Sequence, residues 1–368
     1  MGIQSCQVEN VGIEMLEIYR NKKVFITGNT GFKGSWLCAF FKKLNVQIVG
    51  FALPPATTPN HFSLLNSDYE TTFANILDKE KLESAILKAQ PDVIFHLAAQ
   101  ALVSKSYIDP FNTYQTNVLG TLNILEAVRK CKNVKSVVLV TTDKVYENKE
   151  CEKPYLETDE LGGYDMYSSS KACCEILIRS YRNSFFHLAE YKKKHTVLIA
   201  SVRAGNVIGG GDWNPDRLIP DISIAASKNR KVQIRNPKSV RPWQHVLDCL
   251  YGYLLLGAKL LKEEKDFAEA WNFSPPGNEV KTVEEITAIA KKSWDKVTIE
   301  FPTSGPAFHE AALLSLDNAK AVQRLGWKPA WDTNKSVQRT IEWYKSYYDQ
   351  SKILTSDNID EYLHDTKQ

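Results

Sequence analysis

The chain has 368 residues, of which 43% are hydrophobic and 24% are charged, and its formal net charge is +3. This balance is typical of a soluble globular protein and excludes the strongly basic surface of a nucleic-acid-binding protein. No apolar run approaches the roughly 18 residues that a membrane span needs, and the N-terminus has no basic region before an apolar core. We therefore expect no membrane partner and no secretory signal.

The positions of the cysteines and histidines bear on disulfides and metal sites. The seven cysteines are scattered without a CxxC, which predicts no disulfide framework and a reducing, cytoplasmic location. The seven histidines show no HxxxH or HExxH spacing, so we expect no metal site.

Short β-branched runs alternate with helical patterns through the first half of the chain. The predicted strands cover residues 23–27, 46–53, 93–98, 137–142 and 196–204. The predicted helices cover residues 32–44, 79–88, 113–130 and 166–181. Nearly continuous apolar strands separated by helices indicate a parallel sheet covered on both faces. The expected fold class is α/β, a Rossmann-type doubly wound parallel sheet.

This rhythm breaks after about residue 207, where Gly, Pro, Asp and Trp crowd residues 209–220. We therefore predict a dinucleotide-binding domain over residues 19–206. A smaller C-terminal α/β domain, mainly substrate-binding, is predicted over residues 207–350, although the chain can cross back between the two. Residues 1–18 and 351–368 are predicted to be tails.

A glycine-rich turn, GNTGFKG at residues 28–34, follows the first predicted strand and precedes a helix. A GxxGxxG in this position lets the backbone approach a pyrophosphate and directs the first helical amides at its charge. The alternative is a turn that only joins strand to helix, which the flanking elements disfavour. The spacing resembles that of extended short-chain dehydrogenases. The predicted cofactor contacts in this turn are Gly28, Thr30, Gly31, Phe32, Lys33 and Gly34.

The choice of cofactor depends on the end of the second strand, where an NAD-binding protein usually carries an acidic residue. Here no acidic residue appears before Asp68, and no Arg or Lys between Lys43 and Asp68 can bind a 2′-phosphate. Lys33 can serve a phosphate, and Asp78 sits where the resembling proteins often have an aspartate near the adenine. NAD is favoured over NADP by a small margin.

A candidate catalytic pair is Tyr167 and Lys171, a YxxxK. On a helix, positions i and i+4 share a face, so the phenol and the ammonium can reach one site. The neighbouring positive charges would lower the pKa of the tyrosine and make it a usable base. The motif is weak alone and is also compatible with a solvated helix face. Its order after the phosphate turn strengthens it, as does Thr142 at a strand end that opens onto the ligand crevice.

Further motifs make the resemblance more specific. They are similar to motifs of CDP-glucose 4,6-dehydratases, and the similarity covers roughly residues 19–347. The triplet Thr142-Asp143-Lys144 best separates this family from its relatives, because related dehydratases commonly carry Thr-Asp-Glu there and epimerases carry small hydroxyl residues. The matching segments are residues 27–37, 96–100, 142–148, 203–213, 216–221, 241–248 and 325–329, together with His309-Glu310-Ala311.

The resemblance implies NAD-dependent dehydration of a nucleotide-diphosphate sugar to its 4-keto-6-deoxy form. In that cycle Tyr167 removes the C4 hydroxyl proton, supported by Lys171 and Thr142. Asp143 is the expected acid that protonates the C6 hydroxyl. Lys144 occupies the usual position of the base that removes the C5 proton, although a lysine must lose its own proton to act.

The same resemblance implies further binding residues and an assembly. Arg241 is the expected diphosphate clamp, because a guanidinium offers planar paired donors. Trp213 and Trp243 are equally compatible with packing and with base stacking. A homodimer or homotetramer is expected. Further cofactor contacts are Leu97, Ala98 and Ala99, and the other substrate-binding candidates are Gln100, Asn206, Arg217 and His245.

Three alternatives remain open at this stage. The chain can be a 4,6-dehydratase of a GDP-, dTDP- or UDP-linked sugar, or a sugar-nucleotide 4-epimerase. Asp143-Lys144 disfavours the epimerase. A regulatory protein that binds a dinucleotide without catalysis is the third, and the presence of Thr142, Tyr167 and Lys171 weighs against it.

Overall fold

A computed structural model describes residues 11–150, 153–234, 236–275, 280–301 and 314–367. Its main sheet has seven parallel strands in the order β10-β6-β5-β4-β1-β2-β3. The strand order reverses beside β1, and open α/β sheets bind ligands at the carboxyl ends of strands at such a point. The predicted Rossmann-type fold is confirmed. The strands are β1 Lys23–Thr27, β2 Gln47–Ala52, β3 Glu70–Phe73, β4 Val93–His96, β5 Ser136–Val140, β6 Leu198–Ala204 and β10 Ala270–Phe273.

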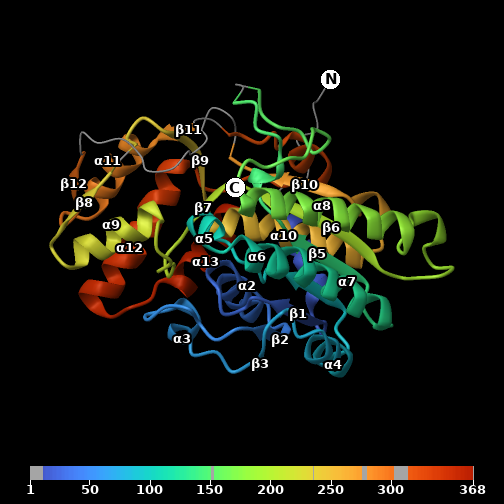
Figure 1. Cartoon of the computed structure of the whole chain (residues 1–368). Coiled ribbons are helices and arrows are strands. Elements are labelled where there is room, and N and C mark those ends of the chain that lie inside the picture. Colours follow the sequence, from blue (N-terminus) through green and yellow to red (C-terminus); the bar gives the residue numbers. More distant parts are fainter. Residues whose placement is uncertain (1–10, 151–152, 235, 276–279, 302–313, 368) are drawn as a thin grey trace, which may run out of the picture.

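Helices cover both faces of this sheet (Figure 1). Successive strand residues point to opposite faces, so Val24 and Ile26 join one core with α2 and α10, whereas Phe25 joins another with α4, α7 and α8. Burial on both faces explains why the strands are apolar throughout. The helices are α2 Phe32–Lys43, α4 Lys79–Ala89, α7 Gly120–Lys130, α8 Met166–Ser184 and α10 Val246–Leu261.

The helix predicted over residues 113–130 is interrupted. The structure has α6 Pro110–Tyr114, a π-helical turn at Gln115–Leu119, and then α7. The amide of Asn117, within this turn, bonds to the backbone of Gln100 and to the Ser170 hydroxyl of α8. These long-range bonds explain why the local winding departs from the α-helix that the sequence pattern predicts.

A smaller part of the molecule lies to one side of the main sheet, on the left in Figure 1. It contains a three-stranded sheet in the order β11-β9-β7 and a two-stranded sheet of β12 and β8. Helix α10 and strand β10 return to the main sheet, so residues 207–350 do not form one continuous unit. The elements are β7 Asn206–Ile208, β8 Lys231–Gln233, β9 Val240–His245, β11 Val280–Thr282, β12 Thr298–Glu300, α9 Leu218–Ser227, α11 Val283–Ser293 and α12 Thr333–Gln350.

Both segments that were expected to be tails contain packed helices in the described residues. The Tyr19 hydroxyl, just after α1 Val11–Leu16, donates to the Leu254 carbonyl of α10 (2.7 Å). Near the other end, α13 Thr355–Asp365 is held by the Trp331 indole, which donates to Asp365 (2.7 Å). Met15 and Leu16 of α1 and Ile359 and Tyr362 of α13 are buried, which side chains of a true tail are not. The remaining elements are α3 His61–Leu64, α5 Val103–Ile108 and short turns at Glu17–Tyr19, Asp143–Val145, Leu188–Glu190, Lys265–Phe267 and Ala321–Leu325.

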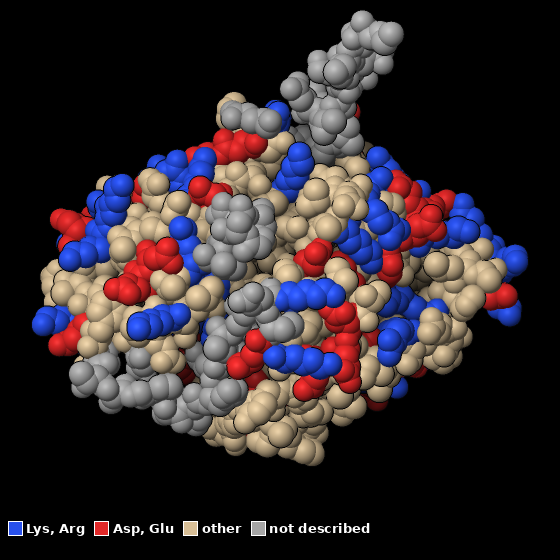
Figure 2. All heavy atoms as spheres, turned by 90° about the horizontal axis from the view of Figure 1, so that it is seen from above, with Lys and Arg blue, Asp and Glu red and all other residues tan. Residues whose placement is uncertain are grey.

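The surface carries both signs of charge. Figure 2 shows Lys and Arg side chains interspersed with Asp and Glu on the face seen from above. Within the described ranges, no helix combines the length and apolar character that a bilayer crossing requires.

Candidate active site

Two positions of the glycine-rich turn, Gly28 and Gly34, have no space for a side chain. Gly28 has φ +73°, and a Cβ there would lie 2.7 Å from the Ala98 amide nitrogen. A Cβ at Gly34 would lie 2.1 Å from the Gly28 carbonyl oxygen. The turn is therefore pressed against the end of β4 and against itself. This close approach keeps the first turn of α2 accessible to a ligand.

The same turn presents the amide end of helix α2. Gly31 precedes the helix in an extended conformation, and the Ser35 amide is the first to bond back to it (2.9 Å). The amides of the first turn have no partner within the helix and can receive a pyrophosphate. The Thr30 hydroxyl bonds to the Leu53 carbonyl at the end of β2 (2.8 Å). This arrangement fits a dinucleotide.

The loop after β4 forms the opposite side of this cradle. The backbone amides of Leu97 and Ala98 both lie 3.2 Å from the Thr27 hydroxyl oxygen. The loop continues through Ala99, which is half-buried. Ala98 lies against the glycine-rich turn, since a Cβ at Gly28 would be 2.7 Å from the Ala98 amide nitrogen.

Two predicted cofactor residues have additional roles. Burial lowers the pKa of Lys33, and its ammonium interacts electrostatically with Cys249, Arg217 and Asp143. The Lys33 side chain therefore belongs with the charges at the strand ends, and its backbone amide is what the turn offers a phosphate. Asp78 caps α4 by accepting from the Lys81 amide (3.1 Å) and pairs with the Lys81 ammonium (2.9 Å).

The tyrosine and lysine of the YxxxK lie on the inner side of α8, where both are buried. The Lys171 ammonium donates to the Val140 carbonyl at the end of β5 (3.1 Å). Burial raises the pKa of Tyr167 to about 12, whereas hydrogen bonding with Thr142 and the Arg217 cation act in the opposite direction. Without a further cation, burial therefore outweighs the lowering that the sequence predicted.

The strand-end triplet follows β5 directly. The Thr142 hydroxyl donates to Asp143 Oδ1 (2.9 Å), and Asp143 is 4% exposed. The other carboxylate oxygen, Oδ2, faces Gly205, where a Cβ would lie 3.3 Å away. Lys144 is half-buried at the next position. The structure thus brings Thr142 and Asp143 beside Tyr167, where an acid and a base can act on one substrate.

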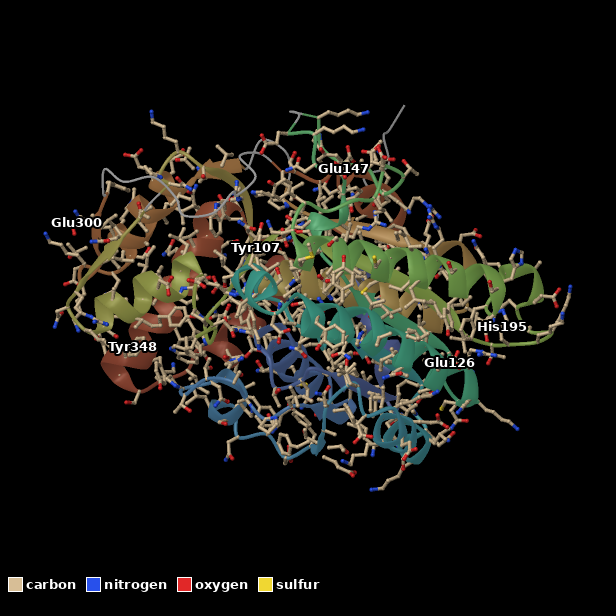
Figure 3. The ribbon with its side chains drawn as sticks, viewed as in Figure 1. Tyr107, Glu126, Glu147, His195, Glu300 and Tyr348 are labelled. Atoms are coloured by element: carbon tan, nitrogen blue, oxygen red, sulfur yellow. The ribbon has the colours of Figure 1, made fainter. Side chains whose placement is uncertain are left out.

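Three predicted substrate residues lie where the two parts of the molecule meet. Arg217 precedes α9, and its Nε lies 3.4 Å from Asp212 Oδ2. Asn206 begins β7, and Arg241 lies on β9 and donates to the Val240 carbonyl (2.8 Å). Figure 3 shows Tyr107 of α5 in this central region. Ser104 of the same helix bonds to Asp216 (2.8 Å), linking α5 to the segment before α9.

Other predicted contacts serve the fold instead. The Gln100 amide nitrogen donates to Leu102 and Thr113, and its oxygen accepts from the Leu102 amide. His245 is fully buried, caps α10 and packs 4.7 Å from the Trp331 ring centroid, and burial lowers its pKa to about 3. The His245 side chain therefore cannot reach a substrate, and that of Gln100 is bonded to Leu102 and to Thr113 of α6.

Trp213 and Trp243, for which packing and base stacking were both possible, are buried side chains. Trp213 is 7% exposed, packs on Trp343 and donates its indole NH to Tyr348 (2.9 Å), so it belongs to an aromatic cluster of the core. Trp243 is equally buried in β9. The segment His309-Glu310-Ala311 lies outside the described residues.

Sequence reasoning missed residues that hold the catalytic helix. Asn117 connects Gln100 to Ser170, the residue before Lys171 (Nδ2 to Oγ, 2.9 Å). Glu175, one turn after Lys171, forms an ion pair with Arg203 of β6 (2.9 Å). The only signal in the sequence was a polar residue on the buried side of an amphipathic helix, and that signal does not identify a partner.

The fold and site together define a dinucleotide-binding enzyme class with a tyrosine–lysine pair at the carboxyl ends of a parallel sheet. The model of the family described as GDP-mannose 4,6 dehydratase matches residues 25–340. A CDP-glucose 4,6-dehydratase of Salmonella typhimurium is 45% identical over 331 residues, covering 89% of this chain and 92% of the relative. The chain belongs to this family of sugar-nucleotide 4,6-dehydratases.

Solved structures share the fold at lower identity. The epimerase Mth375 of Methanothermobacter thermautotrophicus has a TM-score of 0.80 at 20% identity, covering 93% of this chain and 98% of the other. A dTDP-glucose 4,6-dehydratase of Bacillus anthracis, solved in complex with NAD, has a TM-score of 0.72 at 24% identity over 88% and 97% of the two chains. These likenesses establish the architecture.

Proposed function

We propose that this chain dehydrates CDP-glucose to CDP-4-keto-6-deoxyglucose, with NAD as a regenerated cofactor. The observation that carries this proposal is the strand-end triplet, in which Thr142 bonds to Asp143 beside the buried Tyr167. A relative that carries the name CDP-glucose 4,6-dehydratase at 45% identity supports the choice of nucleotide. The alternatives are another nucleotide hexose and a 4-epimerase, and the epimerase needs no acid for elimination.

The residues that would hold NAD are those of the glycine-rich turn and the loop after β4. Gly28 and Gly34 keep the backbone open, and the first amides of α2 would bind the pyrophosphate. Bound NAD supplies the chemistry of accepting a hydride from C4 of the sugar and returning it to C6. NAD is favoured over NADP because β2 ends at Ala52 with no basic residue before Asp68.

In the first step Tyr167 takes the proton of the C4 hydroxyl, and Thr142 bonds to the same oxygen. The pKa of Tyr167 must fall from about 12 for this role. The Lys171 ammonium and the positive charge of oxidised nicotinamide favour the phenolate, because an opposite charge nearby stabilises the ionised form. Lys171 is held in reach by its bond to the Val140 carbonyl.

In the elimination step the 4-ketone acidifies the C5 hydrogen. Lys144, as the neutral amine, removes that proton while Asp143 protonates the C6 hydroxyl, and water leaves. A proton then returns to C5 when C6 is reduced. The Thr142 hydroxyl fixes one oxygen of the buried Asp143, which holds this carboxyl group in place for the elimination step.

For the substrate diphosphate we propose Arg241 as the clamp, with Arg217 and Asn206 as further contacts. Arg217 and Arg241 come from the smaller part of the molecule, and the charge of Arg217 acts on both Tyr167 and Lys33. Two guanidinium groups suit a diphosphate because each offers planar paired donors.

We also propose a homodimer or homotetramer in the cytoplasm. Large apolar side chains are exposed on three adjacent elements, with Ile108 at 83%, Phe111 at 72% and Leu119 at 44%. Such a patch is typical of a protein–protein interface, and a second copy would cover it. Replacing Phe111 with Glu should shift the molar mass measured by light scattering to that of a smaller species. The described cysteines are free thiols, which suits a reducing compartment.

The test is incubation of the pure protein and NAD with CDP-, dTDP-, GDP- and UDP-glucose. Dehydration gives a 4-keto product that absorbs in alkali and has lost one water by mass. CDP-glucose should react fastest, and the Tyr167→Phe variant is the matched control. A product of unchanged mass would identify an epimerase. If none of the four substrates gives a product, the proposal is refuted.

A further inference from the structure

A buried network of charged groups lies behind the strand-end triplet. The Glu175 carboxylate of α8 accepts from the Thr141 hydroxyl (2.5 Å), the Ser201 hydroxyl (2.8 Å) and the Arg203 guanidinium (2.9 Å). Arg203 also donates to the Tyr146 hydroxyl (2.6 Å). Both carboxylate oxygens of Glu175 are therefore engaged by partners from β6 and from the end of β5.

The energetics of this pair suggest that it does more than stabilise the fold. Glu175 is 2% exposed and Arg203 is 3% exposed. Burial raises the pKa of Glu175, but the Arg203 guanidinium and the two hydroxyls reverse this and hold it well below its usual range. Removing two charges from water costs so much that a buried ion pair often stabilises less than apolar residues of similar volume. Its presence beside the site therefore points to a role in positioning.

The position of the network supports that role. Thr141 immediately precedes Thr142 and Asp143, so its bond to Glu175 ties the strand end to α8. Glu175 also lies four residues after Lys171. Burial lowers the pKa of Lys171, Cys174 opposes that lowering, Lys33 adds to it, and the Glu175 charge raises the pKa by a smaller amount. The same carboxylate thus acts on both halves of the catalytic machinery.

We propose that Glu175 is a positioning residue, held by Arg203, that aligns the Thr142–Asp143 strand end with Tyr167 and Lys171. This inference rests on the proposed function. It assigns a role in catalysis to a residue that has no path to the substrate.

The test compares Glu175→Gln with Glu157→Gln in the NAD-loaded enzyme. The Glu157 side chain accepts from the Asn272 amide (2.9 Å), and Glu157 meets Arg203 through its backbone carbonyl (3.2 Å), which the Gln variant keeps, so it is a matched control for loss of a nearby carboxylate. Glu175→Gln should lower kcat by about 10²-fold, the cost of a small misplacement, with little change in KM. The alkaline limb of kcat/KM, where Lys171 loses its proton, should move to lower pH. Glu157→Gln should change neither.

Two further variants keep the test decisive if Glu175→Gln does not fold. Thr141→Val and Ser201→Ala each remove one hydrogen bond to Glu175 and leave its charge; Thr141→Val also removes the hydroxyl's bond to the Val202 carbonyl. Thr141→Val should lower kcat without moving the alkaline limb, and Ser201→Ala should affect kcat less, because Ser201 does not adjoin the triplet. Wild-type kcat and pH profile in Glu175→Gln, or equal effects of Glu157→Gln, would overturn the inference. Failure of the wild-type enzyme to convert any nucleotide hexose would instead overturn the proposed function.

Discussion

Buried carboxylates in two regions of this chain have pKa shifts of opposite direction. At the strand ends, Glu175 is paired with Arg203 and accepts from two hydroxyls. In the helical seam, formed by Asp248, Trp327, Trp331 and Tyr362, the carboxylate meets neutral donors. Asp248 Oδ1 accepts from the Tyr362 hydroxyl (2.9 Å) and from the Ala330 amide (2.8 Å).

The difference shows what a buried guanidinium changes. Burial raises the pKa of Asp248 to about 7, and hydrogen bonds only partly oppose it. For Glu175 the Arg203 cation reverses the effect of burial and the pKa falls. The stability that the Glu175 pair contributes is present above the unfolded pKa and is lost in acid, whereas the seam loses stability as pH rises toward 7. The buried carboxylate of Glu175 beside the active site is therefore kept ionised, whereas burial favours the protonated form of Asp248 in the seam.

The largest expected effect concerns the base itself. Tyr167→Phe keeps the ring packing and removes the phenolic oxygen, so we expect bound NAD and a fall in kcat of about 10²–10⁴-fold. The free energy of unfolding should change by only about 1 kcal/mol, the loss of one hydrogen bond. Steady-state kinetics and urea denaturation check both. Near-normal turnover would show that the strand ends are not where the chemistry occurs.

The next effect separates oxidation from elimination. Asp143→Asn removes the acid but keeps a side chain of the same shape, so C4 oxidation should proceed and stall before water leaves. Reduced nicotinamide should then accumulate and be visible by stopped-flow absorbance. If the variant binds substrate but never reduces the cofactor, Asp143 has a role in the oxidation step instead.

A smaller effect is expected at Lys144. If its neutral amine takes the C5 proton, Lys144→Met should keep C4 oxidation and abolish exchange of the C5 hydrogen with solvent deuterium. Exchange that is slowed but not abolished would mean that Lys144 stabilises the enolate oxygen instead of removing the proton. Unchanged exchange and turnover would make it a bystander.

The smallest expected effect concerns Asp248 in the helical seam and the pH dependence of stability. Between about pH 4 and pH 7 the folded chain keeps the Asp248 proton that the unfolded chain has released. Stability should therefore fall with rising pH by at most about 1.4 kcal/mol per unit from this group. Asp248→Asn should remove that slope in urea titrations across the window. Asp360→Asn in α13, an exposed ion pair with Lys43, should leave it unchanged.

The sequence by itself determined the features that depend on local periodicity and spacing. Strand β1 was predicted with its observed bounds, because a buried strand between turn residues reads directly from the chain. The turn from Gly28 to Gly34 and the pair Tyr167 and Lys171 were found by spacing, since both lie within one element or one connection. The roles expected for Thr142, Asp143 and Lys144 then came from the family resemblance.

Only the tertiary structure decided which polar residues are paired across the fold. Glu175 and Arg203 are 28 residues apart in the chain, and Tyr146 and Asn272 are 126 apart. No periodicity links such positions, because the contact is created by the order of the strands. The same reason explains His245 and Gln100, which have the residue types of a binding site, although His245 is fully buried and Gln100 bonds to Leu102 and Thr113. Burial and partnership are set by packing, and packing is absent from the sequence pattern.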